Sequence, residues 1–117
     1  MVLIMEWQEL KEEQQLNHIK DLSSGEPVVI FKHSTRCSIS STALNRLERS
    51  WKPEEVNGIK PFYLDLISFR NISNKIEDVF KVRHESPQLL IIKNGNCVYH
   101  ASHMGINYEE IKKQLSA

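Results

Sequence analysis

Two short apolar runs constrain the fold of this chain more than any other feature of its sequence. Residues 28–31 are apolar at every position, and residues 88–92 are apolar after the first one. A strand without a polar face is usually covered on both sides, so we expect both runs in the centre of a sheet with helices on its two faces. This pattern predicts an α/β fold built in layers.

The rest of the chain alternates between strand-like and helix-like segments. Strands are expected at residues 2–7, 28–31, 61–66, 88–92 and 97–101. Helices are expected at residues 11–23, 38–51 and 107–115, and a further helix, capped by Asn71 or Ser73, carries Ile76, Val79 and Phe80 on its inner face. Asn94-Gly95 predicts a tight hairpin between the last two strands. The order β-α-β-α-β-α-β-β-α is that of a thioredoxin-like domain, with a mixed central sheet flanked by helices.

Length and composition favour one domain without a nucleic-acid or membrane partner. The chain has 117 residues and no internal repeat, so residues 1–117 are expected to form a single domain. Its 15 basic and 15 acidic residues balance, whereas nucleic-acid-binding domains usually carry a basic excess. No apolar run approaches the length of a membrane span, and residues 1–5 are too short for a signal-peptide core. With only two cysteines, Cys37 and Cys97, a disulfide scaffold is not indicated, and we expect a cytoplasmic protein.

Cys37 is the strongest candidate for a reactive, nucleophilic residue. It follows the buried run at residues 28–31 and opens the helix expected at residues 38–51. In open α/β sheets, functional groups gather at such carboxyl ends of strands. Unpaired backbone N–H groups and the positive end of the helix dipole favour the thiolate, which is the nucleophilic form of cysteine. Arg36 adds a positive charge beside it.

The residue three positions after Cys37 indicates which reaction the thiol performs. A dithiol redox motif would place its second cysteine there, but the sequence reads Cys37-Ser38-Ile39-Ser40. A single thiol attacks a disulfide and must then be released by an outside thiol, so we expect monothiol exchange on mixed disulfides with a small cellular thiol. Ser40 either donates a hydrogen bond to the thiolate or satisfies backbone amides at the helix start.

Four further segments carry a more specific resemblance. They are residues 32–40, residues 72–76, residues 84–88 and Ser102-His103. Together they resemble the YtxJ family of bacillithiol-system proteins, the monothiol bacilliredoxins, and the likeness extends from about Trp7 to the last helix. Many members have proline directly after the reactive cysteine. This chain has Ser38 there, which leaves one more backbone N–H free at the helix start.

The resemblance implies an activity and a set of site residues. The activity is removal of bacillithiol from S-bacillithiolated client proteins, with bacillithiol as the thiol co-substrate, no bound cofactor and no metal. Cys37 matches the family's reactive cysteine, and Pro87 matches its cis-proline. We expect Cys37, Ser40 and Pro87 to form the catalytic centre. Thr35, Arg36, Ser38 and the backbone of Ser86 are expected to bind the substrate, and Lys32 is a second candidate, beside Arg36, for holding the carboxylates of bacillithiol.

The remaining cysteine and histidines receive structural interpretations. Cys97 is expected to be a packing residue rather than a resolving thiol. The spacing of His33, His84 and His103 matches no standard zinc site, so we interpret them as surface or loop residues, with His84 the best candidate for tuning proton chemistry near Pro87.

Two other functions remain open on sequence. One is an iron–sulfur carrier that holds its cluster jointly with a small thiol, although such proteins usually have glycine and phenylalanine where Ser38 and Ile39 stand. The other is a non-catalytic interaction module with the same fold.

Overall fold

The computed structural model describes residues 7–56, residue 59 and residues 61–116 of the chain. The strands are β1 (Gln8–Glu9), β2 (Val28–His33), β3 (Phe62–Asp65), β4 (Gln88–Lys93) and β5 (Asn96–Ser102). The helices are α1 (Gln15–Leu22), α2 (Ser38–Ser50), α3 (Arg70–Phe80) and α4 (Tyr108–Ser116), with 3-10 turns η1 (Pro53–Glu55) and η2 (His103–Gly105). The order expected from the sequence is confirmed.

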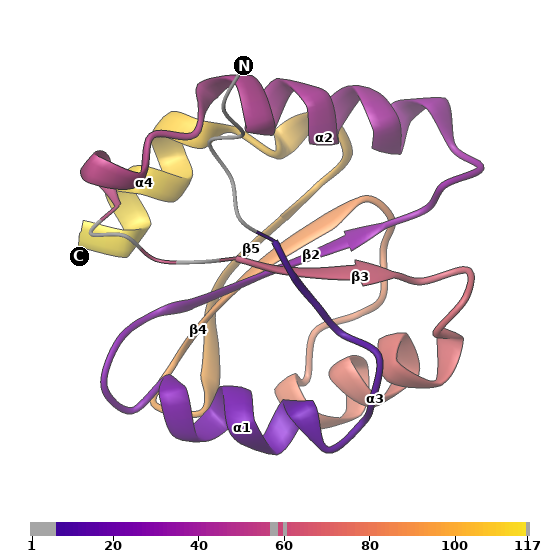
Figure 1. The fold of residues 1–117 in the computed structure, drawn as a ribbon, viewed down its shortest axis with the longest axis vertical. Helices are drawn as coiled ribbons and strands as arrows, with labels where there is room; N and C mark the ends of the chain where they lie inside the picture. Colours follow the sequence, from indigo (N-terminus) through magenta and orange to yellow (C-terminus); the bar gives the residue numbers. More distant parts are fainter. Residues whose placement is uncertain (1–6, 57–58, 60, 117) are drawn as a thin grey trace.

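All five strands form one mixed sheet in the order β1-β3-β2-β4-β5. β3 runs parallel to β1 and β2, whereas β4 runs antiparallel to β2 and β5. Helices α2 and α4 cover one face of the sheet, and α1 and α3 cover the other (Figure 1). The two apolar runs, now β2 and β4, lie side by side in the middle of the sheet, as expected for strands without a polar face.

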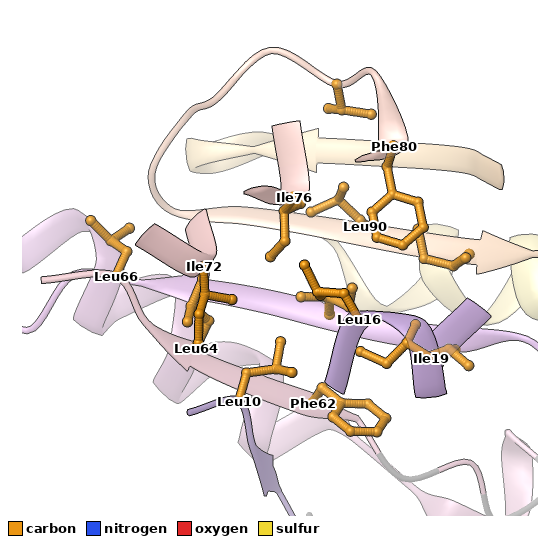
Figure 2. Close-up of a cluster of buried hydrophobic side chains, with 14 residues drawn as sticks. Leu10, Leu16, Ile19, Phe62, Leu64, Leu66, Ile72, Ile76, Phe80 and Leu90 are labelled. Atoms are coloured by element: carbon orange, nitrogen blue, oxygen red, sulfur yellow. The ribbon is translucent and has the colours of Figure 1, made fainter. Parts of the chain in front are cut away.

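Each face of the sheet has its own hydrophobic core because side chains alternate along a strand. In β2, Val29 and Phe31 pack toward α2 and α4, while Val28 and Ile30 pack toward α1 and α3. Figure 2 shows the second core, in which side chains from the sheet meet those from α1 and α3. The labelled residues are Leu10, Leu16, Ile19, Phe62, Leu64, Leu66, Ile72, Ile76, Phe80 and Leu90. The alternation also assigns Lys32 to the α1/α3 face and His33 to the α2/α4 face.

The N-terminal expectations need two corrections. The strand predicted at residues 2–7 falls mostly outside the described residues, and the edge strand that the structure shows is the shorter β1, which follows Trp7. Helix α1 begins at Gln15 rather than at residue 11. The Gln15 side chain explains this start, because its Oε1 accepts hydrogen bonds from the backbone N–H groups of Lys11 (2.7 Å) and Glu12 (2.9 Å). These bonds hold residues 11–14 in a turn.

The expected caps of α3 are also wrong. The helix begins at Arg70, so Asn71 and Ser73 lie inside its first turns. The turn before α3 is organised by Asp65 instead, whose Oδ1 accepts hydrogen bonds from the N–H groups of Ile67 (3.1 Å) and Ser68 (3.3 Å). Ser73 is buried, so its hydroxyl makes a polar contact inside the protein and does not cap the helix.

The hairpin between β4 and β5 is confirmed. Asn94 and Gly95 both have positive φ, 52° and 76°, as a two-residue turn of this kind requires. Ser23, at the end of α1, holds the turn: its carbonyl accepts from Asn94 N–H and its hydroxyl from Gly95 N–H, both at 2.8 Å. In the part of the chain that the structure describes, no helix is long and apolar enough to cross a membrane.

Candidate active site

Cys37 occupies the N-cap position of α2, at the end of the short loop that leaves β2. Its backbone is extended, with φ −116° and ψ 120°. The Cys37 N–H donates to the carbonyl of Ser34 (3.2 Å), and the Cys37 carbonyl accepts the N–H of Ser41 (3.1 Å). The loop is thereby closed on itself and joined to the helix. The thiol is free and half-buried, so it is held in place and remains open to solvent.

The Cys37 side chain stands at the N-terminus of α2 but makes no hydrogen bond to the N–H groups of the helix. At an N-cap, the first N–H groups of the helix have no partner within the helix and present partial positive charge to the cap side chain. Here they belong to a helix of 13 residues, long enough to sustain the dipole. Thr35, Arg36 and Ser38 are exposed around the thiol, so their side chains are available to a ligand.

The proline expected beside the cysteine is at the start of β4. The Ser86–Pro87 peptide bond is cis, as the family resemblance implied. Lys32, near the end of β2, pairs with Gln88 in β4, so Pro87 lies next to the segment that leads from β2 to Cys37. The Pro87 carbonyl accepts the N–H of His103 at 3.0 Å, which ties η2 to the same edge of the sheet.

Ser40 is fully buried beneath this loop. Its Oγ accepts the N–H of Ser34 at 3.1 Å and lies 2.7 Å from Nδ1 of His33. The backbone amide that Ser40 satisfies belongs to Ser34, in the loop before the N-cap, and not to the helix start. Among the described residues, no hydrogen bond joins Ser40 to the Cys37 sulfur, so its role toward the thiolate stays a prediction.

The position of His33 differs from the one expected from the sequence. It was expected on the surface or in a loop, but it is the last residue of β2 and is only 5% exposed. Burial lowers the pKa of His33, while Asp65 and Glu48 act in the opposite direction. Continuing the alternation of Val29 and Phe31 for one more step would have placed its side chain on the α2 face.

Lys32 also differs from expectation. Its side chain is buried on the α1/α3 face of the sheet, where it cannot hold the carboxylates of a ligand at the surface. Burial lowers its pKa to about 8, opposed by the negative charge of Glu77. Of the two cations expected to hold these carboxylates, only Arg36 is exposed.

Cys97 lies far from Cys37. It stands beside Ile92, which pairs with Val28 at the beginning of β2, whereas Cys37 follows the end of that strand. The length of β2 separates them by about 16 Å, at roughly 3.3 Å per residue. Cys97 also packs on the opposite core, donates to the carbonyl of Tyr99 (3.3 Å), and has a pKa raised by burial. Cys97 is thus a packing residue, as expected.

His84 and His103 were the other two histidines considered for a metal site, and the backbone N–H of His103 bonds the Pro87 carbonyl. His84 Nδ1 is 3.2 Å from Ser73 Oγ, and its pKa is lowered first by burial and then by the charge of Lys32. His103 is exposed and lies 3.6 Å from a carboxylate oxygen of Glu85. Across the described ranges, no group of three His, Cys, Asp or Glu residues is arranged to hold a metal ion.

Comparison with known proteins identifies the family and the fold. Residues 8–111 match the family model described as monothiol bacilliredoxin BrxC. A solved protein with a thioredoxin fold is 27% identical, with a TM-score of 0.77 over 93% of this chain and 92% of that one. Thioredoxins of Malassezia sympodialis (17% identity, TM-score 0.74, 100% and 96% coverage) and Fasciola hepatica (16%, 0.70, 93% and 96%) share the fold. The chain therefore belongs to the monothiol bacilliredoxin BrxC family of thiol–disulfide oxidoreductases and has the thioredoxin-like fold.

Proposed function

We propose that the protein removes bacillithiol from S-bacillithiolated client proteins, with Cys37 as the nucleophile. The observation that carries the proposal is the isolation of Cys37. It caps α2 with a free thiol, Ser40 stands where a second cysteine would resolve it, and Cys97 is at the other end of the sheet. A disulfide requires Cα atoms within about 7 Å, so Cys37 must be released by an external thiol.

The reaction proceeds in two balanced exchange steps. The Cys37 thiolate attacks the bacillithiol sulfur of the mixed disulfide. A bond forms between these two sulfurs, the client's sulfur leaves as a thiolate, and it then takes a proton from solvent. Next, the thiolate of a second bacillithiol molecule attacks the bacillithiol sulfur held on Cys37. Bacillithiol disulfide is released, and the Cys37 thiolate is restored.

The groups around Cys37 support binding of the mixed disulfide. Bacillithiol carries carboxylates, and Arg36 is the exposed cation beside the thiol, with the polar side chains of Thr35 and Ser38 next to it. We expect the Ser86 backbone, beside Pro87, to pair with an extended client segment as an added strand. We place this activity in a reducing cytoplasm, where a free thiol of this kind persists.

A turnover assay on a bacillithiolated protein tests the proposal. The native chain and the variants Cys37→Ala and Cys97→Ala are compared with bacillithiol in excess, and release of the client thiol is followed. We expect loss of activity with Cys37→Ala and full activity with Cys97→Ala. With bacillithiol left out, mass spectrometry of the native chain should show one bacillithiol on Cys37.

Two results would refute the proposal. Turnover by Cys37→Ala would show that another group is the nucleophile. Equal turnover of a client carrying glutathione in place of bacillithiol would show that bacillithiol is not the preferred thiol. An Arg36→Gln variant that loses only this preference would locate the recognition at the mouth of the site.

A further inference from the structure

A buried polar pair joins the end of β2 to the first turn of α2. His33 Nδ1 lies 2.7 Å from Ser40 Oγ, and the same oxygen accepts the Ser34 N–H at 3.1 Å. Both side chains are at least 95% buried, since His33 is 5% exposed and Ser40 is 0% exposed. Water cannot easily replace any partner in such a site, so the protons of these two side chains are constrained by each other.

The number of protons in this pair limits what Ser40 can do. A serine hydroxyl has one proton and two acceptor lone pairs. One lone pair accepts from the Ser34 N–H. If Nδ1 of His33 carries no proton, Nδ1 must accept the hydroxyl proton, and Ser40 has none left to donate. If Nδ1 carries a proton, it donates to the second lone pair, and the hydroxyl proton is free for another acceptor.

The position of Ser40 on the helix identifies that acceptor. Cys37 is the N-cap, and Ser40 is the third residue of the helix after it. In a capping box, the side chain at each of these two positions hydrogen-bonds the backbone N–H of the other residue, so both positions belong to the same first turn. The Cys37 sulfur is therefore the candidate acceptor for a hydroxyl proton released by His33, since a thiolate is a stronger acceptor than a thiol.

The charges facing His33 control where its proton resides. Asp65 and Tyr63 approach from β3, with Asp65 the register partner of His33 and the Tyr63 ring 5.7 Å away. Glu48 approaches from α2, and its carboxylate is bonded to Trp7 Nε1 at 2.8 Å. Both carboxylates favour a protonated imidazole, but burial acts more strongly and lowers the pKa of His33.

We infer that His33 is a positioning residue that switches Ser40 between two states: with a proton on His33 Nδ1, Ser40 donates a hydrogen bond to the Cys37 thiolate, and without it, Ser40 is held by the imidazole. The inference rests on the nucleophilic role of Cys37 in the proposed function. It adds that the Ser40 hydroxyl stabilises the thiolate when the thiolate forms by release of a disulfide. Otherwise that hydroxyl is bonded to the His33 imidazole.

The first test reads the His33 ring directly by ¹⁵N NMR. Spectra of the native chain are compared with Cys37 reduced and with Cys37 blocked by iodoacetamide, which removes the thiolate. We expect a larger fraction of His33 with a proton on Nδ1 in the reduced protein, because the thiolate favours the state in which Ser40 is free to donate. Exposed His18 serves as an internal reference whose tautomer does not change. An identical His33 tautomer in both samples would overturn the inference.

The second test measures the rate at which iodoacetamide alkylates Cys37 at neutral pH. Ser40→Ala should slow alkylation by about tenfold, because it removes the hydrogen bond to the thiolate. His33→Phe should not slow alkylation, because it removes the imidazole that holds the Ser40 hydroxyl and leaves that proton free to donate. It should also remove the part of the pH profile that His33 contributes. The double variant should match Ser40→Ala, since His33 acts through Ser40.

A slower rate in His33→Phe, or a double variant that differs from Ser40→Ala, would show that His33 acts on Cys37 without Ser40 and would overturn the inference. Unfolding curves of each variant identify any loss that is due to folding. Both tests use iodoacetamide rather than bacillithiol, so they can succeed where the turnover assay fails. The inference and the proposed substrate are thereby tested separately.

Discussion

Lys32 and Gln88 face each other across β2 and β4, and both side chains are buried on the α1/α3 face of the sheet. Among the described residues, neither Lys32 Nζ nor Gln88 Oε1 has a hydrogen-bond partner, although Gln88 Nε2 donates to the carbonyl of Arg83 at 3.0 Å. An unpaired ammonium in the centre of a sheet costs stability, because the charge has lost its water.

Lys32→Met should therefore stabilise the fold, by about 2 kcal/mol at pH 7. In the unfolded chain, Lys32 titrates near 10.5, whereas burial lowers its folded pKa to about 8. Between these values the unfolded state binds more protons, so the native protein gains stability as pH rises and the advantage of the variant shrinks. Urea unfolding at pH 7 and pH 9.5 measures both effects. The exposed Lys75→Met is the control, and an equal gain from it would contradict this account.

Ser40→Cys should convert the site to a dithiol. The N-cap and the third helical residue belong to the same first turn, so the introduced thiol would lie within bonding reach of Cys37. We expect an intramolecular disulfide on mild oxidation, detected by mass spectrometry as the loss of two hydrogens and of the free thiols at positions 37 and 40, with Cys97 still reduced. Persistence of all three free thiols would show that the side chain at position 40 points away from Cys37.

Oxidation of the native chain should not join Cys37 to Cys97, because the length of β2 separates them. Treatment with diamide is expected to give intermolecular disulfides at Cys37 only, because burial raises the pKa of the Cys97 thiol and disfavours its thiolate. Peptide mapping of the oxidised chain checks this. A Cys37–Cys97 peptide within one chain would require the sheet to open and would contradict the fold.

Ser23→Ala should weaken folding without changing the chemistry. The Ser23 hydroxyl accepts the Gly95 N–H at 2.8 Å and donates to the Lys20 carbonyl at 2.7 Å. Its loss removes one of the two bonds between Ser23 and the hairpin turn and leaves only the bond from Asn94 N–H to the Ser23 carbonyl. We expect a loss of about 1–2 kcal/mol in the free energy of unfolding. The turn follows β4 at the end of the sheet away from Cys37, so alkylation of Cys37 should keep its rate.

Ser24→Ala is the matched control for this substitution. The Ser24 hydroxyl donates to the Asp21 carbonyl at 2.7 Å, but it is exposed and water replaces that bond. Its unfolding free energy should change by less than about 0.5 kcal/mol. Equal losses in the two variants would mean that the contact between α1 and the hairpin turn does not stabilise the fold.

The sequence predicts those features that depend on residues close together in the chain. The apolar runs of β2 and β4, the Asn94-Gly95 turn and the start of α2 all follow from local patterns, and the structure confirms them. The starts of α1 and α3 differ from the prediction, because side chains near each start bond the backbone of the turn before the helix. Gln15 delays the start of α1, and Asp65 organises the turn before α3.

By itself, the sequence determined the strand order along the chain, the placement of Cys37 at a helix start and the absence of a second cysteine three residues later. Only the tertiary structure decided that His33 meets Ser40, that Lys32 is buried and that Cys97 lies out of reach. The physical reason is that hydrogen-bond partners and burial depend on which strands and helices pack together. Neither can be read from a pattern of neighbouring residues.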